Sequence, residues 1–376
     1  MLLLLVMAAP LFTLHSSLFT LHSLMPRLLI IRFSAMGDVA MMVPVVRRLA
    51  LQYPDWDITV LTRQRLTQLF VTPEPNIHLI GVDLNDYKGF GGLNKLFKEM
   101  KAQSFDAVAD FHDVLRTKYL RRRFRWAGVK VAVIDKGRSE KKQLLGNGLQ
   151  VSPLCHTLER YADVLKQLSL PVDLSASIPP FESASEEKKE ELSRQLRIHR
   201  EKSWIGIAPF AAHPGKIYPL EQMHEVARQL ASRGFEVLLF GAGPHESSVM
   251  ESWEQSGITS VSGKLAGLHE EMQLMSCLRT MIAMDSANMH IASLTGIPVI
   301  SIWGATHPKA GFTPWGQSDD HIIQDAELAC RPCSIYGKKP CKYGDLRCMT
   351  HITPDQIVER TLSIMNTSHH ESFESL

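Results

Sequence analysis

Residues 28–38 read LLIIRFSAMGD, and this stretch decides the fold. Its first six residues form a short apolar run that is typical of a buried strand. A loop of small residues ending in Gly37 and Asp38 follows, and a helical pattern then extends over 39–51. A buried strand that passes into a helix through a short loop begins a β-α-β unit. The stretch therefore predicts a parallel sheet with helices on both faces.

The same alternation of strand and helix patterns continues along the chain. In the first half, strands are expected at 58–61, 77–82, 106–111 and 129–134, with helices near 93–103, 114–125 and 157–168. In the second half, strands are expected at 205–209, 236–240, 281–284 and 299–303, with helices at 220–232, 245–255, 268–277, 287–295 and 354–365. Two series of this kind predict two Rossmann-like α/β domains that face a cleft.

A stretch without periodicity separates the two series. Residues 169–182 read SLPVDLSASIPPFE and are rich in Pro and Ser, as linkers are. We therefore expect an N-terminal domain over 26–170, a linker over 171–182, a C-terminal domain over 183–366 and a tail over 367–376. Ser183 and Glu186 have the spacing of a capping box, which predicts that a charged helix begins there and runs to about His199.

Residues 1–25 differ from the rest of the chain. They contain no Lys or Arg, unlike a secretory signal, and polar residues and Pro10 interrupt their apolar run. The hexapeptide LFTLHS occurs twice, at 11–16 and 18–23. We expect a non-native or disordered extension, with the working protein beginning at Met25; a weak membrane anchor is the alternative. No later stretch reaches about 18 apolar residues, so no transmembrane domain is expected.

Composition and charge exclude several classes of protein. Of the 376 residues, 45% are hydrophobic and 21% charged, which is ordinary for a globular protein and excludes wholesale disorder. A net charge of +2 is too balanced for a dedicated nucleic-acid binder. However, residues 116–142 hold eleven Lys and Arg against two acids. This basic block indicates one anionic partner, or else a solvated helix face.

Four of the six cysteines fall close together. Cys330, Cys333, Cys341 and Cys348 include one CxxC pair, but the second pair lacks that spacing. A structural zinc site, free or redox-active thiols, and disulfides all remain open for this cluster. Six cysteines in a chain of this length do not make a disulfide scaffold, so a reducing compartment is favoured.

Ligands of open parallel sheets bind at the carboxyl ends of the strands, and this rule selects four loops. The first carries Asp38, which is either a catalytic carboxylate or a cap for the following helix. The second, PFAAHPGK at 209–216, places Lys216 near a strand end, as a phosphate ligand or a solvated lysine. The third, GAGPHE at 241–246, lacks the third glycine of a dinucleotide fingerprint, but its Glu246 suits a ribose hydroxyl.

The fourth loop is the strongest candidate for an anion site. Residues 285–290 read DSANMH and lie between a strand and a helix, whose first turn offers free backbone N–H groups. A plain N-cap by Asp285 or Ser286 is the alternative. Asn288 and His290 add polar groups beyond those that a cap needs, and this favours binding.

Taken together, these loops resemble a known family. The run RFSAMGDV at 32–39, with Pro44 and Leu49 downstream, resembles the opening of the ADP-heptose:lipopolysaccharide heptosyltransferases, glycosyltransferase family nine. The segment DSANMHIASLTGIPVISIWGATHP at 285–308 resembles the donor-site motif of that family. The resemblance implies a GT-B fold, inversion at the donor anomeric carbon, and no cofactor or catalytic metal.

The resemblance also implies roles for individual residues. Asp38 matches the general base, Lys216 a lysine on the donor phosphates, and Glu246 a carboxylate near the adenosine ribose. Asp285 matches a residue that contacts heptose hydroxyls. The remaining donor-site residues of the motif are Ser286, Ala287, Asn288 and His290. Ser286 and Ala287 stand where Thr-Gly is usual, and Ala211 and Ala212 stand where hydroxyl residues are common.

These features predict an inverting glycosyltransferase with a hexosyl-type transfer, moving heptose from ADP-heptose to the lipopolysaccharide inner core. The alternatives are a GT-B enzyme for another nucleotide sugar, a GT-B sugar-nucleotide epimerase, and a sugar- or nucleotide-binding module without activity. We expect a cytoplasmic monomer with a lipid-linked anionic acceptor, peripheral contact with the inner membrane surface, and no nucleic-acid partner. The expected acceptor contacts are Arg116, Arg121, Arg122 and Arg123, while Tyr119, Phe124 and Trp126 are expected in the core.

Overall fold

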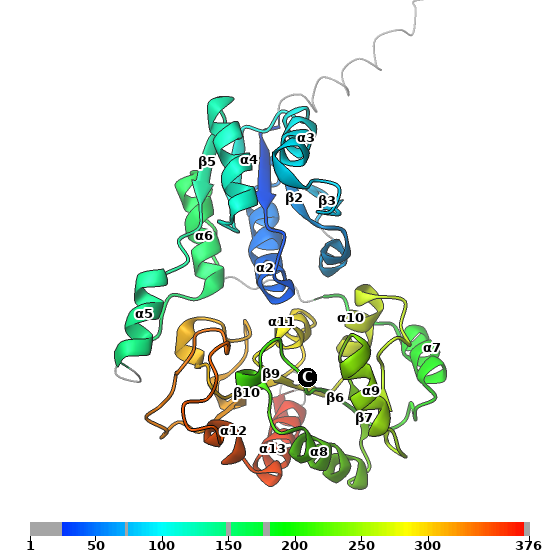
Figure 1. The fold of residues 1–376 in the computed structure, drawn as a ribbon. Helices are drawn as coiled ribbons and strands as arrows, with labels where there is room; N and C mark the ends of the chain where they lie inside the picture. The colour runs from blue at the N-terminus through cyan, green and yellow to red at the C-terminus, as the bar shows by residue number, and fades with distance from the viewer. Residues whose placement is uncertain (1–24, 72–73, 148–151, 176–180, 372–376) are drawn as a thin grey trace, which may run out of the picture.

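A computed structural model describes residues 25–71, 74–147, 152–175 and 181–371. The predicted extension at 1–25 lies outside these residues except for Met25. The predicted tail begins inside a helix that continues to Glu371. The chain forms two α/β halves, one above the other in Figure 1.

The first half is built on a five-stranded parallel sheet with the order β3-β2-β1-β4-β5. The predicted strand at 28–33 is its centre, and the side chains of residues 28–31 are fully buried. Strands buried on both faces read as continuous apolar runs, which is why this sequence lacks alternation. The strands are β1 (Arg27–Ile31), β2 (Asp57–Arg63), β3 (Ile77–Val82), β4 (Ala107–Asp110) and β5 (Lys130–Val133).

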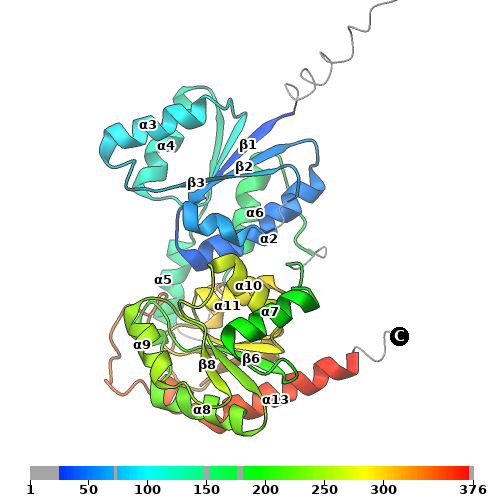
Figure 2. The same ribbon diagram turned by 90° about the vertical axis from the view of Figure 1, so that its right-hand side faces the viewer.

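Alternate residues of β1 serve two different cores. Leu28 and Ile30 pack with helices α2 (Met36–Gln52) and α6 (Thr157–Gln167). Leu29 and Ile31 face the opposite way and pack with α3 (Gly89–Lys101) and α4 (Leu115–Trp126). Figure 2 shows these two pairs of helices on opposite faces of the first sheet. The short helix η1 (Gln64–Leu69) follows β2.

The second half holds a six-stranded parallel sheet with the order β11-β10-β9-β6-β7-β8. Four of its strands match the predicted ones closely. The two edge strands, β8 and β11, are three residues long and were not predicted, because three residues carry no readable periodicity. The strands are β6 (Trp204–Ala208), β7 (Glu236–Leu239), β8 (Ile258–Ser260), β9 (Thr280–Met284), β10 (Val299–Trp303) and β11 (Ile322–Gln324).

The helices of the second half cover both faces of this sheet. On one face, α8 (Leu220–Ser232) and α13 (Pro354–Glu371) share a core with β6 and β9. On the other face, α10 (Leu268–Ser276) and α11 (Ala287–Leu294) join the large core that also contains α2 of the first half. The other helices are α7 (Glu186–Leu196), α9 (Pro244–Ser252) and α12 (Arg347–Thr350).

Two local predictions were wrong. The N-cap of α7 is Ser185, whose Oγ accepts a hydrogen bond from the backbone N–H of Lys188, and not Ser183. This helix ends at Leu196, before the predicted His199, because Arg197 adopts a left-handed conformation with a φ of 58°. A further helix, α5 (Arg138–Asn147), occupies part of the basic block where no helix was expected.

Backbone hydrogen bonds also join the two halves outside the shared core. The N–H of Leu154 donates to the carbonyl of Lys309, and the N–H of Thr157 donates to the carbonyl of Gly311. These bonds lie just before α6 and at its first residue, within the segment predicted to belong to the N-terminal domain. Figure 1 accordingly shows α5 beside the second half rather than beside the first sheet.

The cysteine-rich segment is fixed to the second half by Arg331. Its guanidinium is almost fully buried and donates to three backbone carbonyls: Gly304 at 2.6 Å, Thr306 at 3.0 Å and Asp325 at 2.5 Å. Three backbone acceptors, two of them in fully buried bonds, therefore depend on one planar donor group. Arg331 thereby joins the loop that follows β10, at Gly304 and Thr306, to Asp325, which follows β11.

We expect Arg331→Lys to lower the free energy of unfolding by about 2–4 kcal/mol, because an ammonium cannot reach three carbonyls in the same geometry. Urea denaturation of the purified protein would measure this loss. The exposed Arg228, which pairs with Glu225 on a helix surface, provides the matched Arg→Lys control and should cost less than about 0.5 kcal/mol. Equal losses in the two variants would contradict the bracing role of Arg331.

Candidate functional site

A cavity of about 590 Å³ lies between the two halves. This volume is in the range of small-molecule binding sites. All eight residues predicted for catalysis and donor binding line it: Asp38, Lys216, Glu246, Asp285, Ser286, Ala287, Asn288 and His290. They come from loops at the carboxyl ends of β1, β6, β7 and β9, as the rule for parallel sheets requires.

Asp38 is the third residue of α2 and points toward the second half. Its Oδ2 accepts a hydrogen bond from the backbone N–H of Ala35 at 3.0 Å, so it does cap the helix. The same oxygen lies 2.6 Å from a guanidinium nitrogen of Arg32, and 30% of the side chain remains exposed. Because it also lines the cavity, capping and a role in the site are compatible.

The electrostatic surroundings keep Asp38 ionised. Burial by itself would raise the pKa of this carboxyl, but the charge of Arg32 and the hydrogen bond from Ala35 lower the pKa below its usual value. Arg32 is itself buried, and its charge lies over the ring of Tyr161. The hydroxyl of Tyr161 donates to the carbonyl of Asp38 at 3.1 Å, which fixes the first turn of α2.

Lys216 is held inside the site and is not a solvated surface lysine. Its Nζ lies 2.9 Å from Oδ2 of Asp285, and both side chains are largely buried. The lysine is the last residue of the short helix η3 (Pro214–Lys216), which follows β6. Lys216 and Asp285 therefore form a neutral pair from two neighbouring strand ends.

Glu246 stabilises the turn that precedes α9. Its Oε2 accepts a hydrogen bond from the backbone N–H of Ala242 at 2.9 Å. A Cβ at Gly241 would lie only 3.0 Å from this oxygen, so a side chain there would displace the carboxylate. The carboxylate thus borders the cavity in a fixed orientation.

The first turn of α11 offers an anion-binding site. Ser286 occupies the N-cap position, but its side chain makes no capping hydrogen bond, and its Oγ is buried without a partner among the described residues. Asp285 is occupied by Lys216. The plain N-cap interpretation is therefore wrong, and the helix N-terminus keeps N–H groups available for a phosphate.

His290 lies one turn further along α11 and is buried. Burial lowers its pKa to about 4, although the nearby Asp285 carboxylate opposes that shift, so the imidazole is neutral. Its Nδ1 has no hydrogen-bond partner in the part of the chain that the structure describes. A Cβ at Gly37 would lie 3.0 Å from the ring carbon Cδ2, so only glycine allows α2 to approach this closely.

A cluster of cations surrounds Asp113, at the carboxyl end of β4. Its carboxylate lies 2.8 Å from Arg121, 3.1 Å from Arg138 and 3.9 Å from Lys118. Lys136 donates to the backbone carbonyl of the same residue at 3.3 Å. Burial and the charge of Arg32 lower the pKa of Lys136, which shows how crowded the positive charge is here. The cluster therefore suits an anionic ligand.

The four arginines predicted for acceptor binding do not line the cavity. Arg121 is bound internally by Asp110 and Asp113, Arg123 lies over the ring of Phe97, and Arg122 is exposed on α4. Arg116 borders a separate hollow with Arg63 and Arg65. Lys136, which no sequence pattern singled out within the basic block, interacts electrostatically with Asp38, and Arg138 joins it at Asp113.

The aromatic residues of α4 divide into two groups. Phe124 is buried as expected, and Tyr119 is half-buried. The prediction for Trp126 was wrong, because 81% of its surface is exposed. It is the last residue of α4, and helical spacing places it on the side opposite the buried Leu120 and Phe124.

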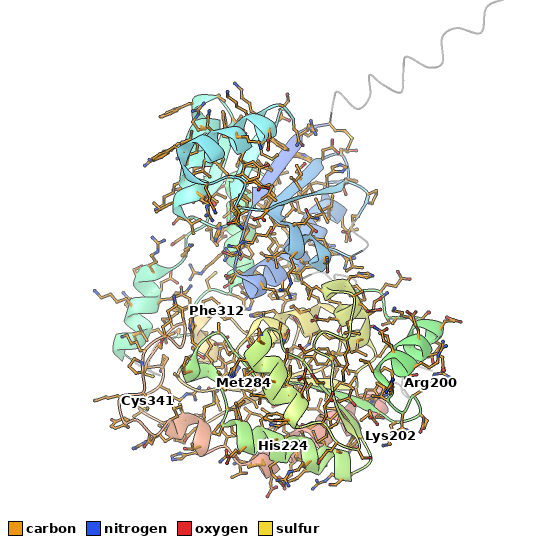
Figure 3. All side chains as sticks on the ribbon, turned by 45° about the vertical axis from the view of Figure 1, so that its right-hand side comes forward. Arg200, Lys202, His224, Met284, Phe312 and Cys341 are labelled. Carbon is orange, nitrogen blue, oxygen red and sulfur yellow. The ribbon has the colours of Figure 1, made fainter. Side chains whose placement is uncertain are left out.

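The cysteine cluster contains free thiols in this structure. Across the described ranges, no three His, Cys, Asp or Glu side chains are arranged to hold a metal ion, so structural zinc finds no support. The segment instead contributes Tyr336 and Lys338 to the cavity, and the preceding loop contributes Phe312. Figure 3 shows Phe312 near the junction of the halves and Cys341 farther out. These contributions had no motif that could reveal them.

No helix in the described part of the chain is long and apolar enough to span a membrane. The segment at 1–25, for which a weak membrane anchor was the alternative interpretation, lies outside the described residues apart from Met25.

Comparison with known proteins supports one family. The profile described as glycosyltransferase family 9 (heptosyltransferase) matches residues 93–343. Lipopolysaccharide core heptosyltransferase OpsX of Haemophilus influenzae is 25% identical over 301 residues, covering 78% of this chain and 83% of the relative. Lipopolysaccharide heptosyltransferase 2 of Salmonella typhimurium is 25% identical over 199 residues; that match covers 50% of this chain and only about half, 54%, of the relative.

Solved structures show the same fold. The glycosyl transferase family 9 protein of Veillonella parvula has a TM-score of 0.71 and 23% identity, over 91% of this chain and 98% of that one. The ADP-heptose lps heptosyltransferase II of E. coli has a TM-score of 0.68 and 19% identity, over 91% and 99% of the chains. The predicted GT-B fold of two Rossmann-like domains is confirmed.

We expect His290 to remain uncharged down to about pH 5. An unfolded chain protonates its histidines near pH 6.5. The unfolded state therefore binds more protons than the folded state between about pH 6.5 and 4, and the free energy of unfolding falls as the pH falls through that window. His290→Gln should reduce this slope by up to about 1.4 kcal/mol per pH unit.

Urea denaturation at several pH values measures the slope for both proteins. The exposed His269 supplies the matched His→Gln control. An unaltered slope in His290→Gln would show that the buried imidazole titrates normally.

Proposed function

Because this chain belongs to glycosyltransferase family 9, we propose that it transfers heptose from ADP-heptose to the inner core of a lipopolysaccharide, with inversion at the anomeric carbon. One observation carries the proposal: Asp38 of the first half faces the same cavity as Lys216, Asp285 and the open N-terminus of α11. A carboxylate on one wall and phosphate ligands on the other are what transfer from a nucleoside diphosphate sugar requires. The names of the relatives supply the sugar and the acceptor class.

The second half would bind the donor. The diphosphate would accept hydrogen bonds from the first turn of α11, and Lys216 would turn from Asp285 toward the phosphates. Asp285 would then be released to accept hydrogen bonds from the hydroxyls of the sugar. Glu246, held at the neighbouring strand end, would accept from the ribose. Negative charge grows on the leaving ADP during the reaction, so both phosphate contacts strengthen in the transition state.

Asp38 would accept the proton of the attacking hydroxyl. A carboxylate with a lowered pKa is a weak base toward a free alcohol. In a transition state resembling an oxocarbenium ion, however, the attacking oxygen becomes more acidic as its bond to the sugar forms, and the proton can be taken late. Positioning then matters more than basicity, and Arg32 with the Ala35 N–H supplies it.

The cation cluster around Asp113 would bind the acceptor. Arg121, Lys118, Lys136 and Arg138 carry four positive charges, whereas only two carboxylates, Asp110 and Asp113, pair with members of the cluster. Carboxylates or phosphates of an acidic core oligosaccharide would satisfy this excess. The cluster lies in the half that carries Asp38, so it would bring the acceptor hydroxyl to the base.

The donor is open to a direct test. Ser286 and Ala287 depart from the family pattern beside the sugar, which makes another nucleotide sugar the alternative. A panel of nucleotide sugars with truncated core acceptors, with products identified by mass, decides between them. We expect a heptosylated product with ADP-heptose; transfer only from another donor would overturn the proposed sugar.

We expect Asp38→Asn to lower turnover about 100-fold or more while ADP binds with an affinity within a few-fold of the original. The amide oxygen still accepts the Ala35 N–H and so preserves the cap, but the amide cannot take a proton. Steady-state kinetics and calorimetric ADP titration measure the two effects, and thermal denaturation verifies the fold. Turnover near the original value would leave Asp38 as a cap alone.

Lys216→Ala should reduce both the affinity for ADP and turnover, with turnover falling by about tenfold or more because the lysine also stabilises the leaving group. Calorimetry and steady-state kinetics again separate the two. Lys98→Ala, on the exposed surface of α3, is the control and should change neither quantity. If Lys216→Ala behaved like this control, the phosphate contact would be refuted.

A further inference from the structure

Helix α4 carries an apolar stripe on the face that points away from its sheet. Leu115, Tyr119 and Trp126 recur at helical spacing and lie on one side of the helix, with Arg122 between them. Leu115 and Trp126 are 85% and 81% exposed, while Leu120 and the other core positions of the helix pack against the sheet. A helix that already buries one face has no need of large apolar residues on the other.

A second helix extends this stripe. Phe90, at the start of α3, is 81% exposed, and its ring centroid lies 6.0 Å from that of Tyr119. Figure 2 shows α3 and α4 side by side on the same side of the first sheet. We call Phe90, Leu115, Tyr119 and Trp126 the apolar stripe. Exposed apolar groups that gather in this way mark an interaction surface.

Cations flank the apolar stripe on both sides. Helix α4 has six Lys and Arg and no acid. Arg121 and Lys118 reach back to acids at the end of β4. The other four form no ion pair with any described residue: Arg116, Arg122, Arg123 and Arg125. A long apolar or aromatic stripe bordered by arginines on a helix surface has the composition of a helix that lies in a membrane interface.

We propose that the apolar stripe docks this protein on an anionic lipid surface. The rings of Phe90 and Trp126 and the side chain of Leu115 would enter the boundary between headgroups and acyl chains, and the flanking arginines would contact lipid phosphates. Charge complementarity selects this occupant, because α4 has four arginines without an ion pair among the described residues and no acid that would bind a basic partner. Such an attachment is reversible and needs no spanning helix.

The location of the stripe deepens the proposed function, on which this step rests. Leu115 lies two residues after Asp113 in the sequence, and Asp113 is the centre of the cation cluster proposed to bind the acceptor. A lipid-linked acceptor held in the same membrane would therefore extend from the lipid surface past the first turn of α4 to the cavity. Docking would supply the acceptor by confining enzyme and substrate to one surface.

Sedimentation with lipid vesicles tests the proposal. The probes are vesicles of phosphatidylethanolamine with roughly a quarter phosphatidylglycerol, and vesicles of phosphatidylcholine alone. We expect binding to the anionic vesicles that weakens as the salt concentration rises, and at least tenfold weaker binding to phosphatidylcholine. Equal binding to both, or binding to neither, would overturn the proposal.

Two variants separate the apolar and charged contributions. Replacing Phe90, Leu115 and Trp126 together with Ser should weaken anionic-vesicle binding at least tenfold. Arg122→Gln with Arg125→Gln should reduce the preference for anionic vesicles several-fold. Tyr343→Ser, at a 52% exposed aromatic residue in the other half, is the matched control and should change nothing. Circular dichroism shows whether each variant is folded, and loss of binding in the control alone would refute the assignment.

Lipids brominated on their acyl chains report the depth of the contact. They should quench part of the tryptophan fluorescence of the original protein. This quenching should be absent in Trp126→Phe, which keeps an aromatic ring at the position but lacks the indole. Quenching that is the same in both proteins would place the contact elsewhere. Light scattering addresses a second copy of the chain as the occupant: a dimer that the triple Ser variant dissociates would overturn the membrane proposal.

Turnover with a deacylated, water-soluble acceptor distinguishes this proposal from the proposed function. The triple Ser variant should match the original protein with that acceptor and fall behind it only with the lipid-linked acceptor on vesicles. Absence of transfer from every donor, with vesicle binding intact, would refute the proposed function and leave the docking surface standing. Equal turnover of variant and original on vesicles would refute its role in acceptor supply.

Discussion

The contact between α2 and α11 is the constraint on which the rest of the structure depends. Both helices follow the central strands of their sheets, and their apolar residues belong to one core that runs through both halves. Gly37 lies against His290 and Ala287, so the first turns of the two helices almost touch. One helix presents Asp38 and the other presents unbonded N–H groups. The close approach therefore creates the cavity and fixes its two walls at once.

Two internal ion pairs prepare this cavity before any ligand arrives. Arg32 holds Asp38, and Lys216 holds Asp285. Each pair neutralises a charge that would otherwise be costly to keep partly buried. The two pairs differ in what they permit: Arg32 is buried and fixed, whereas Lys216 borders the open cavity and can exchange its partner for a phosphate. The site is thus rigid where a proton is taken and adjustable where the leaving group is bound.

Much of this arrangement could be predicted from the sequence, for a physical reason. Buried parallel strands are continuous apolar runs, and their carboxyl ends place loop residues such as Asp38 and Asp285 in one region whatever the details of packing. The edge strands were too short to read. Lys136 and Arg138 were missed because positive charge in a block of residues does not reveal which side chains meet in space. Trp126 was misassigned because its aromatic character was taken to indicate burial, whereas its position on the helix places it opposite the buried Leu120 and Phe124.

The shared core has a consequence for how such a protein can change. Enzymes made of two similar units are often thought of as interchangeable parts, in which one unit can be replaced to alter a substrate. Here the core continues through the junction, and the backbone at Leu154 and Thr157 is bonded to Lys309 and Gly311 of the other half. A hybrid that takes its halves from two relatives would inherit mismatched helices at the junction. Successful recombination would have to transfer together all the residues at which α2 contacts α11. The segment to be exchanged therefore includes residues from both sides of the linker and cannot end at the linker.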